Sequence, residues 1–287
     1  MAAYHVRSNS FPSRQHPIIP EFDALLCRLR SSETTSSSSS YVSSNLNGLQ
    51  DLHDCLDKLL SLPLNQQALS KEQNYQKKVD VVLDGSLRLL DLCNTAKDAL
   101  LQMKESTQEL QSAMRRKHGG EISLSSEVKK FLSSRKMMKK ALSKAMENKS
   151  KFSTSSLKKE EQTAEIVSIL REVELITFSV FESMVSFVSE SKSSKANSWS
   201  LVSKVMKSRR VACEGVNECN EFASADGALA SLISKKIKKT DNKVEEINAQ
   251  NELQSVESCI QDLEQGVESL YRRLIKTRVS LLNILNH

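Results

Sequence analysis

The sequence predicts an all-α protein: an elongated, antiparallel multi-helix bundle that follows a disordered N-terminal tail. Three observations support this prediction. Apolar side chains recur at spacings of three and four over several long stretches, which is the pattern of one buried helical face. The 287 residues include only four prolines, with none after Pro63, and only 5% are aromatic, which disfavours a β-rich fold. With 39% hydrophobic and 26% charged residues, the composition is typical of a soluble globular protein with a sizeable core.

The longest regular stretch, residues 79–114, predicts one long helix packed inside the bundle. The stretch is followed by Gly119 and Gly120, and this tight turn predicts an antiparallel neighbour. A second apolar column makes the surface wider than a two-stranded seam, so several neighbouring helices are expected. The main face consists of Val79, Val82, Ser86, Leu89, Cys93, Ala96, Leu100, Met103, Thr107, Leu110 and Met114, and the second column of Leu83, Leu87, Leu90, Leu101 and Ala113.

Two domains of different character are expected along the chain. Residues 1–44 form a flexible, Ser-rich tail in which residues 20–30 carry the pattern of one short helix. Within this tail, residues 31–44 are of low complexity and bury too little apolar surface to offset the entropy cost of ordering. Residues 45–287 form the helical bundle domain. Its first helix is predicted at 45–61, where Pro63 punctuates the pattern, and an irregular connector follows.

Further helical stretches are predicted after the Gly-Gly turn, at 126–149, 156–191 and, with a looser pattern, 199–239. In the second of these, the most apolar run of the chain is interrupted by Glu174, Glu182 and Glu190. The run is therefore too short for a membrane span, and a buried bundle helix is expected instead. On 126–149 the side expected to be buried consists of Val128, Phe131, Leu132, Met138, Leu142 and Met146.

The last stretch, 241–285, is the strongest coiled-coil candidate because its apolar spacing is the most regular. Its partner is either inside the chain or on another molecule, and the matching stripe at 79–114 favours a partner inside the chain. The positions concerned are Leu253, Val256, Ile260, Leu263, Val267, Leu270, Leu274, Thr277, Leu281 and Ile284.

The six cysteines are scattered at helix-like positions without a C-x-x-C pair, which predicts reduced, mostly buried thiols in a reducing compartment. We therefore expect a cytoplasmic protein, with attachment to a membrane surface as an alternative. The first 20 residues hold two arginines and no acidic residue, but they lack the apolar core of a targeting sequence. The sequence leaves the nucleus and the plastid open as further compartments.

No motif for catalysis, metal binding or nucleotide binding occurs in the sequence. The five histidines lie singly, and neither H-E-x-x-H, G-x-S-x-G, a Walker loop nor G-x-G-x-x-G is present. His53 and Asp57 are four residues apart on a predicted helix, where a surface contact is expected rather than an acid/base pair. We therefore expect a protein that is not an enzyme and has no cofactor. A site assembled from distant residues would escape this kind of search.

A short N-terminal motif predicts a phosphorylation-dependent partner. Arg7, Ser8, Ser10 and Pro12 fit R-S-x-S-x-P, the pattern that 14-3-3 proteins bind when the second serine is phosphorylated. Arg7 precedes Ser10 by three residues, which suits a basophilic kinase. The alternative is a chance occurrence in a Ser-rich tail.

Positive charge is concentrated around the predicted helix at 126–149. Residues 115–151 hold twelve Lys or Arg against three Glu, a net charge of +9, whereas the entire chain carries +6. This basic face has four readings: a solvated surface, a site for anionic lipid, a site for an acidic protein, or a site for nucleic acid. Nucleic acid is not expected, because no aromatic residues are interleaved with the cations. The basic face comprises Arg115, Arg116, Lys117, Lys129, Lys130, Lys136, Lys140 and Lys144.

Five separated blocks occur in order along the chain: HVRSNSFPSRQHP, CRLRSS with the serine run after it, LQDLHDCLDKLL, DGSLRLLDLCNTAKDALLQMKE and LYRRLIKTRVSLLNILNH. Together they resemble a plant-specific BYPASS-like family of unknown function that has many Arabidopsis members. The resemblance implies an all-helical protein, an association with root and shoot development, and no established activity or cofactor. It carries over no active-site residues. The expected function is that of an interaction or adaptor protein, and the alternative is a peripheral membrane module.

Overall fold

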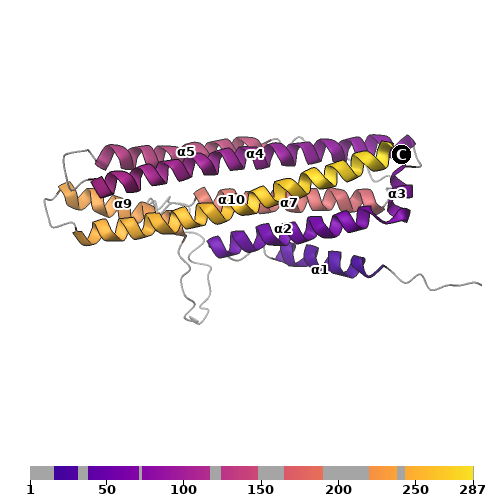
Figure 1. The fold of residues 1–287 in the computed structure, drawn as a ribbon, viewed down its shortest axis with the longest axis horizontal. Helices are drawn as coiled ribbons and strands as arrows, with labels where there is room; N and C mark the ends of the chain where they lie inside the picture. Colours follow the sequence, from indigo (N-terminus) through magenta and orange to yellow (C-terminus); the bar gives the residue numbers. More distant parts are fainter. Residues whose placement is uncertain are drawn as a thin grey trace, which may run out of the picture.

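The computed structural model describes residues 16–31, 38–70, 73–116, 124–147, 165–189, 220–237 and 243–286, which form eight α-helices and no β-strand. The helices lie side by side in one elongated bundle (Figure 1), so the predicted all-α bundle is confirmed. Their bounds are α1 Ile18–Ser31, α2 Ser39–Leu60, α3 Pro63–Ser70, α4 Gln73–Arg116, α5 Leu124–Glu147, α7 Glu165–Ser189, α9 Glu221–Ile237 and α10 Lys243–Asn286.

Helices α4 and α10 form the long seam of the bundle. Each has 44 residues, or about 66 Å at 1.5 Å per residue. They run antiparallel, as shown by the ion pair between Lys104 Nζ and Glu264 Oε2 at 2.7 Å and the one between Lys97 and Glu268. The prediction that the last helix pairs with the long central helix inside the chain is therefore confirmed.

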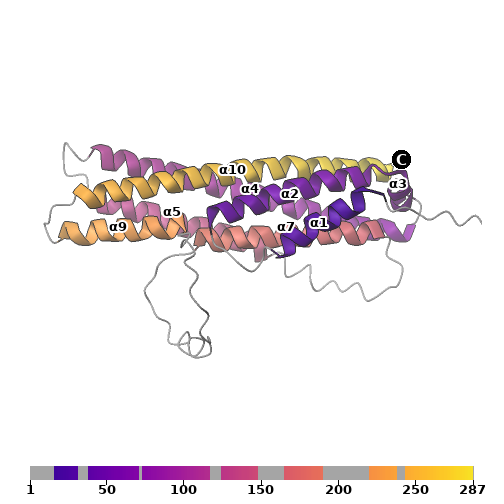
Figure 2. The same ribbon diagram turned by 90° about the horizontal axis from the view of Figure 1, so that it is seen from below.

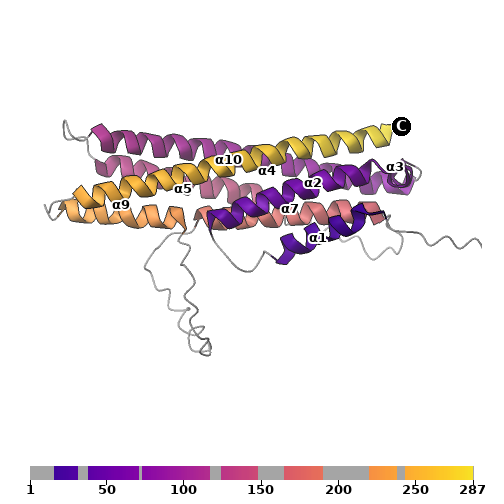
Figure 3. The same ribbon diagram turned by 60° about the horizontal axis from the view of Figure 1, so that its bottom comes forward.

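The remaining helices complete the bundle around this seam. Helix α5 packs beside α4, and α7 and α9 follow one another along the opposite side (Figures 2 and 3). Helix α2 runs parallel to α10, because Gln50 contacts Ser269 and Asp54 contacts Arg273 in the same direction along both helices. Helix α1 lies on the outer side of α2. Helix α3 packs against α10 at the end of the bundle that holds the C-terminus.

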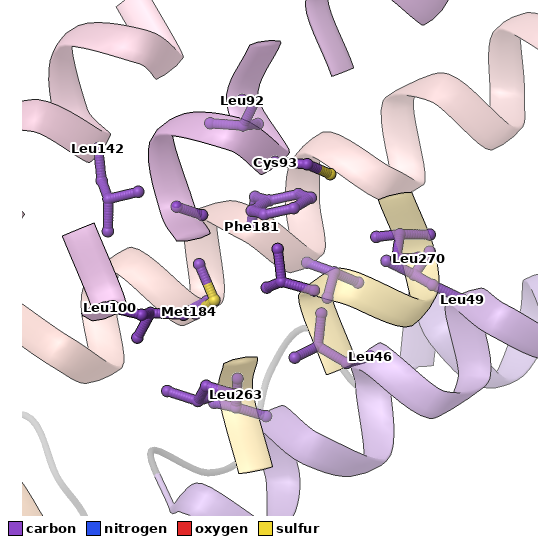
Figure 4. Close-up of a cluster of buried hydrophobic side chains, with 14 of the residues drawn as sticks. Leu46, Leu49, Leu92, Cys93, Leu100, Leu142, Phe181, Met184, Leu263 and Leu270 are labelled. Atoms are coloured by element: carbon purple, nitrogen blue, oxygen red, sulfur yellow. The ribbon is translucent and has the colours of Figure 1, made fainter. Parts of the chain in front are cut away.

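Apolar side chains from five helices meet in the core. Figure 4 shows Leu49 from α2, Leu92 from α4, Leu142 from α5, Phe181 from α7 and Leu263 from α10 in this cluster. On α4, the predicted main face is buried or half-buried from Val82 to Met114, while the side chain of Val79 lies outside the described residues. On α10, all ten predicted core positions are buried. The period of the apolar pattern thus located the core of both long helices.

The second apolar column of α4 was partly mispredicted. Leu87 and Leu101 are about half exposed, whereas Leu92 and Ala99 are buried instead. The reason is that α4 has α10 on one side and α5 on the other, so the side between them that faces α7 is buried. Leu87 and Leu101 lie on the side of α4 that points away from the bundle.

Two predicted irregular segments are in fact helical. Helix α2 begins at Ser39, inside the segment predicted as a linker, and Ser38 caps it by accepting a hydrogen bond from the backbone N–H of Tyr41 at 3.3 Å. Serine is a favoured N-cap residue because its hydroxyl satisfies an otherwise unpaired N–H. Pro63 does not open a connector but occupies the first position of α3, where its fixed φ suits a helix start. The short helix predicted at 20–30 is confirmed as α1.

Candidate interaction surface on helix α5

Helix α5 separates apolar and basic side chains onto opposite sides. Val128, Phe131, Met138 and Leu142 are buried in the core. Leu132 is an exception to the prediction, because it is 41% exposed, and Met146 is only partly buried. At 100° per residue, Leu132 lies about 90° from the centre of the buried side, at the edge of the helix. The lysines Lys129, Lys130, Lys136, Lys139, Lys140 and Lys144 are all exposed.

Most lysines on the basic face of α5 have no acidic partner. Among the described residues, no carboxylate pairs with Lys129, Lys136, Lys140 or Lys144. Lys130 differs, because its Nζ lies 2.9 Å from Glu127 Oε1, and this hydrogen bond raises the pKa of Lys130. The four unpaired ammonium groups are therefore available to an anionic partner.

The end of α4 extends the basic face. Arg115 and Arg116 are exposed in the last turn of α4, where cations are favoured by the negative end of the helix dipole. Arg115 Nη2 donates a 3.5 Å hydrogen bond to Gln111 Oε1. Figure 1 shows the end of α4 beside the start of α5. Lys117, which was also predicted in this face, lies outside the described residues.

A groove with a volume of about 460 Å³ lies at the other end of the basic face, between α4, α5 and α7. Its apolar lining includes Leu92, Ala145 and Phe178, and its charged lining consists of Arg88, Asp91 and Lys144. The groove therefore places two cations and one carboxylate beside an apolar wall.

Arg135 is a buried cation that the sequence search overlooked. Its side chain faces the core rather than the basic face, and its guanidinium donates hydrogen bonds to the backbone carbonyls of Val188 and Phe222, both at 3.1 Å. It also forms an ion pair with Asp226 and lies over the ring of Phe222, 5.3 Å from the centroid. The available signal was its position between Phe131 and Met138 on the apolar side of the helix.

The contacts of Arg135 join the end of α7 to the start of α9. Asn220 acts at the same place, because its Nδ2 donates to the carbonyl of Phe187 at 2.7 Å while its Oδ1 accepts from the N–H of Phe222 at 2.9 Å. The rings of Phe187 and Phe222 meet edge to face at 5.5 Å. Burial raises the pKa of Asp226, and the nearby Arg135 opposes this shift. The arrangement is structural and fixes two helices end to end.

His53 and Asp57 do not form the predicted surface contact, because both side chains are buried. His53 Nε2 lies 3.3 Å from the Thr177 hydroxyl, which already donates to the Val173 carbonyl, so Nε2 must be the donor. Burial lowers the pKa of His53 to about 4, which keeps the ring neutral. Asp57 instead pairs with Lys276 Nζ at 2.8 Å. The sequence pattern missed this burial because α7 and α10 cover this side of α2.

The remaining predictions concern the phosphorylation motif, the cysteines, metal binding and membrane spans. The phosphorylation motif of Arg7, Ser8, Ser10 and Pro12 lies outside the described residues. Of the six cysteines, four are described as free thiols, three of them buried. Within the described helices, no group of three or more His, Cys, Asp or Glu side chains is placed to hold a metal ion. None of these helices is both long and apolar enough to cross a membrane.

Comparison with known proteins gives one result. No curated protein and no solved structure matches the chain. Residues 45–284 match the family model described as Protein BPS1. Of the eight described helices, this range contains five in full, including α5 with its basic face, together with all but the first six residues of α2 and the last two residues of α10. The BYPASS-like resemblance of the sequence blocks is thereby confirmed, and the chain belongs to the BPS1 family.

Proposed function

We propose that this BPS1-family chain is a non-enzymatic interaction protein of plant root and shoot development, which binds an acidic protein partner through the basic face of α5. The observation that carries the proposal is the exposed row formed by Lys129, Lys136, Lys140 and Lys144, which has no acidic partner among the described residues. The developmental role rests on the family resemblance. The bundle supplies a rigid support that holds the lysines in fixed positions.

The packing of α5 supports a docking role for its basic face. The apolar half of the helix is part of the core, so the lysine row keeps its spacing without any partner. A preformed surface of one charge steers an oppositely charged protein toward the correct orientation and raises the association rate. Because exposed charges are screened, this binding should weaken strongly with added salt.

The N-terminal motif supplies a second, regulated contact in the proposal. Phosphorylation of Ser10 adds close to two negative charges and three acceptor oxygens. Arg7, Ser8 and Pro12 complete the pattern that a 14-3-3 protein reads. The chain would then bridge a phosphoserine reader and the partner of α5, which is the behaviour of an adaptor.

A pull-down from plant tissue tests the proposed phosphorylation-dependent contact with a 14-3-3 protein. We expect the full chain to capture a 14-3-3 protein, and both phosphatase treatment and Ser10→Ala to abolish the capture. Ser13→Ala is the matched control, since it removes a neighbouring serine outside the fixed positions of the motif. Unchanged capture by Ser10→Ala would rule out the phosphorylation-dependent contact. It would not bear on the proposed role of α5, which is tested separately.

Anionic lipid is the second candidate partner, favoured by the same unpaired lysine row. Each well-placed cation near an anionic membrane contributes roughly 1 kcal/mol. However, Val128, Phe131 and Leu142 are buried in the core and cannot insert into lipid while the bundle is folded. Attachment would therefore be electrostatic only, and weaker than that of a free amphipathic helix.

Flotation with vesicles containing phosphatidylserine separates the two candidates. Lipid binding predicts flotation at low salt that is lost in the Lys136→Gln/Lys140→Gln variant and kept in the control Lys58→Gln/Lys243→Gln, which removes two exposed lysines elsewhere. No flotation of the wild-type chain at low salt would eliminate the lipid candidate. The acidic-protein candidate would then remain.

A further inference from the structure

An exposed apolar patch lies across the outer side of the seam between α4 and α10. Figure 1 shows these two helices side by side near the C-terminus, and Arg278 of α10 donates hydrogen bonds to the Leu83 carbonyl and to the Ser86 hydroxyl of α4, the latter at 2.7 Å. This contact sets the register of the two antiparallel helices, so Leu87 of α4 and Val279 of α10 lie at nearly the same height along the bundle. The seam patch consists of Leu87, Ile275, Val279 and Leu282, which are 47%, 41%, 49% and 37% exposed.

The two helices that flank the seam patch carry opposite charges. On α4, the exposed residues Asp80, Asp84 and Asp91 line one border. On α10, the side chains of Arg272 and Lys276 line the other and are 75% and 68% exposed, although each also has an acidic neighbour within its own chain. Going from α4 to α10, the surface is therefore first acidic, then apolar and then basic.

A two-fold axis parallel to the helices makes this surface complementary to itself. Such an axis places α4 of one copy opposite α10 of the other and leaves each residue at its own height along the bundle. Asp91 and Arg272 share a height, because each lies about midway between the Ser86–Arg278 and Lys97–Glu268 contacts. The acidic border of each copy would meet the basic border of the other, with the apolar strips between them.

We propose that the seam patch is an interface with a second copy of this chain, related by a two-fold axis parallel to α4 and α10. In this dimer Leu87 of each copy packs on Val279 of the other, and Asp91 pairs with Arg272. A two-fold axis perpendicular to the helices would instead oppose acidic with acidic borders, which disfavours it. The basic face of α5 is not part of the seam patch.

Sedimentation equilibrium of the full chain in a dilution series tests the proposal. We expect a dimer of twice the 32.1 kDa chain mass that dissociates on dilution. Val279→Glu buries a charge in the interface and should weaken association about tenfold or more. The matched control is Ile247→Glu, which alters an exposed apolar residue of the same helix outside the seam patch and should leave association unchanged.

A charge exchange tests the orientation of the two copies. Asp91→Arg alone creates an all-basic contact and Arg272→Asp alone an all-acidic contact, so each variant should be monomeric. An equimolar mixture restores both pairs and should form a heterodimer. A monomeric wild-type chain at every concentration, a Val279→Glu variant that associates as tightly as the wild type, or a mixture that stays monomeric would each overturn the proposal.

Discussion

At the scale of single residues, Glu174 is the most unusual group of the described core. The side chain lies on α7, is 4% exposed, and neither carboxylate oxygen has a hydrogen-bond partner among the described residues. Its carboxylate lies directly against Gly85 of α4, where an added Cβ would meet it and force the side chain to shift. Burial raises the pKa of Glu174 to about 7, and Arg88 and Arg171 oppose the shift.

This burial predicts a pH-dependent stability. The folded-state pKa of Glu174 lies above the value of 4.5 expected for the unfolded chain, so the folded protein binds more protons between these values. Stability is therefore fully present below pH 4.5 and declines as the pH rises through about 7. We expect Glu174→Gln to raise the free energy of unfolding by about 3 kcal/mol at pH 8 and to have little effect near pH 4.5.

Urea unfolding of both proteins across this pH range measures the difference. His53 titrates in an overlapping range with the opposite sign, because its folded-state pKa of about 4 lies below its ordinary 6.5, so its contribution is lost as the pH falls. It is present in both proteins and cancels in the difference. Glu105→Gln is the control for an exposed carboxylate on α4. A pH-independent difference would contradict the assignment of the titration to Glu174.

At the scale of helices, the junction between α7 and α9 depends on Arg135. Its guanidinium satisfies two backbone carbonyls and the carboxylate of Asp226, all in a buried site. Removing one partner of a buried pair leaves the other unpaired and costs about 3–5 kcal/mol. We therefore expect Arg135→Met to lower the free energy of unfolding by that amount.

A comparison of Arg135→Met with a double variant identifies the source of this loss. Arg135→Met combined with Asp226→Leu removes both charges, and the double variant should recover much of the stability lost in Arg135→Met. Denaturant unfolding at constant pH is the measurement. Equal losses in the single and double variants would show that the carbonyl contacts, rather than the ion pair, hold the junction.

The sequence pattern predicted the helices to different degrees. The apolar period located the core of α4 and α10, because a strict repeat of threes and fours permits only one buried side. It missed Arg135 and His53, because their burial depends on partners from α7 and α9 that no local pattern specifies. It also mistook the start of α2 for a linker, since a serine run carries no apolar signal even where Ser38 caps a helix.

At the scale of the whole molecule, the bundle presents two separate surfaces. The basic face of α5 was predicted from the sequence, because charge and helical period both come from local residues, and its described lysines are indeed exposed. The seam patch was not predicted, because Leu87 belongs to an apolar column that a helical pattern alone assigns to the core. Only the placement of α10 against α4 shows which apolar residues remain outside.

Proximity labelling in plant tissue tests the central claim, that the basic face of α5 is a docking surface. The wild-type chain is compared with a variant in which Lys129, Lys136, Lys140 and Lys144 are changed to Gln, and with the Lys58→Gln/Lys243→Gln control. We predict a set of acidic proteins that is labelled by the wild type and the control and lost with the four-lysine variant. Identical labelling by all three proteins would contradict a docking role for α5.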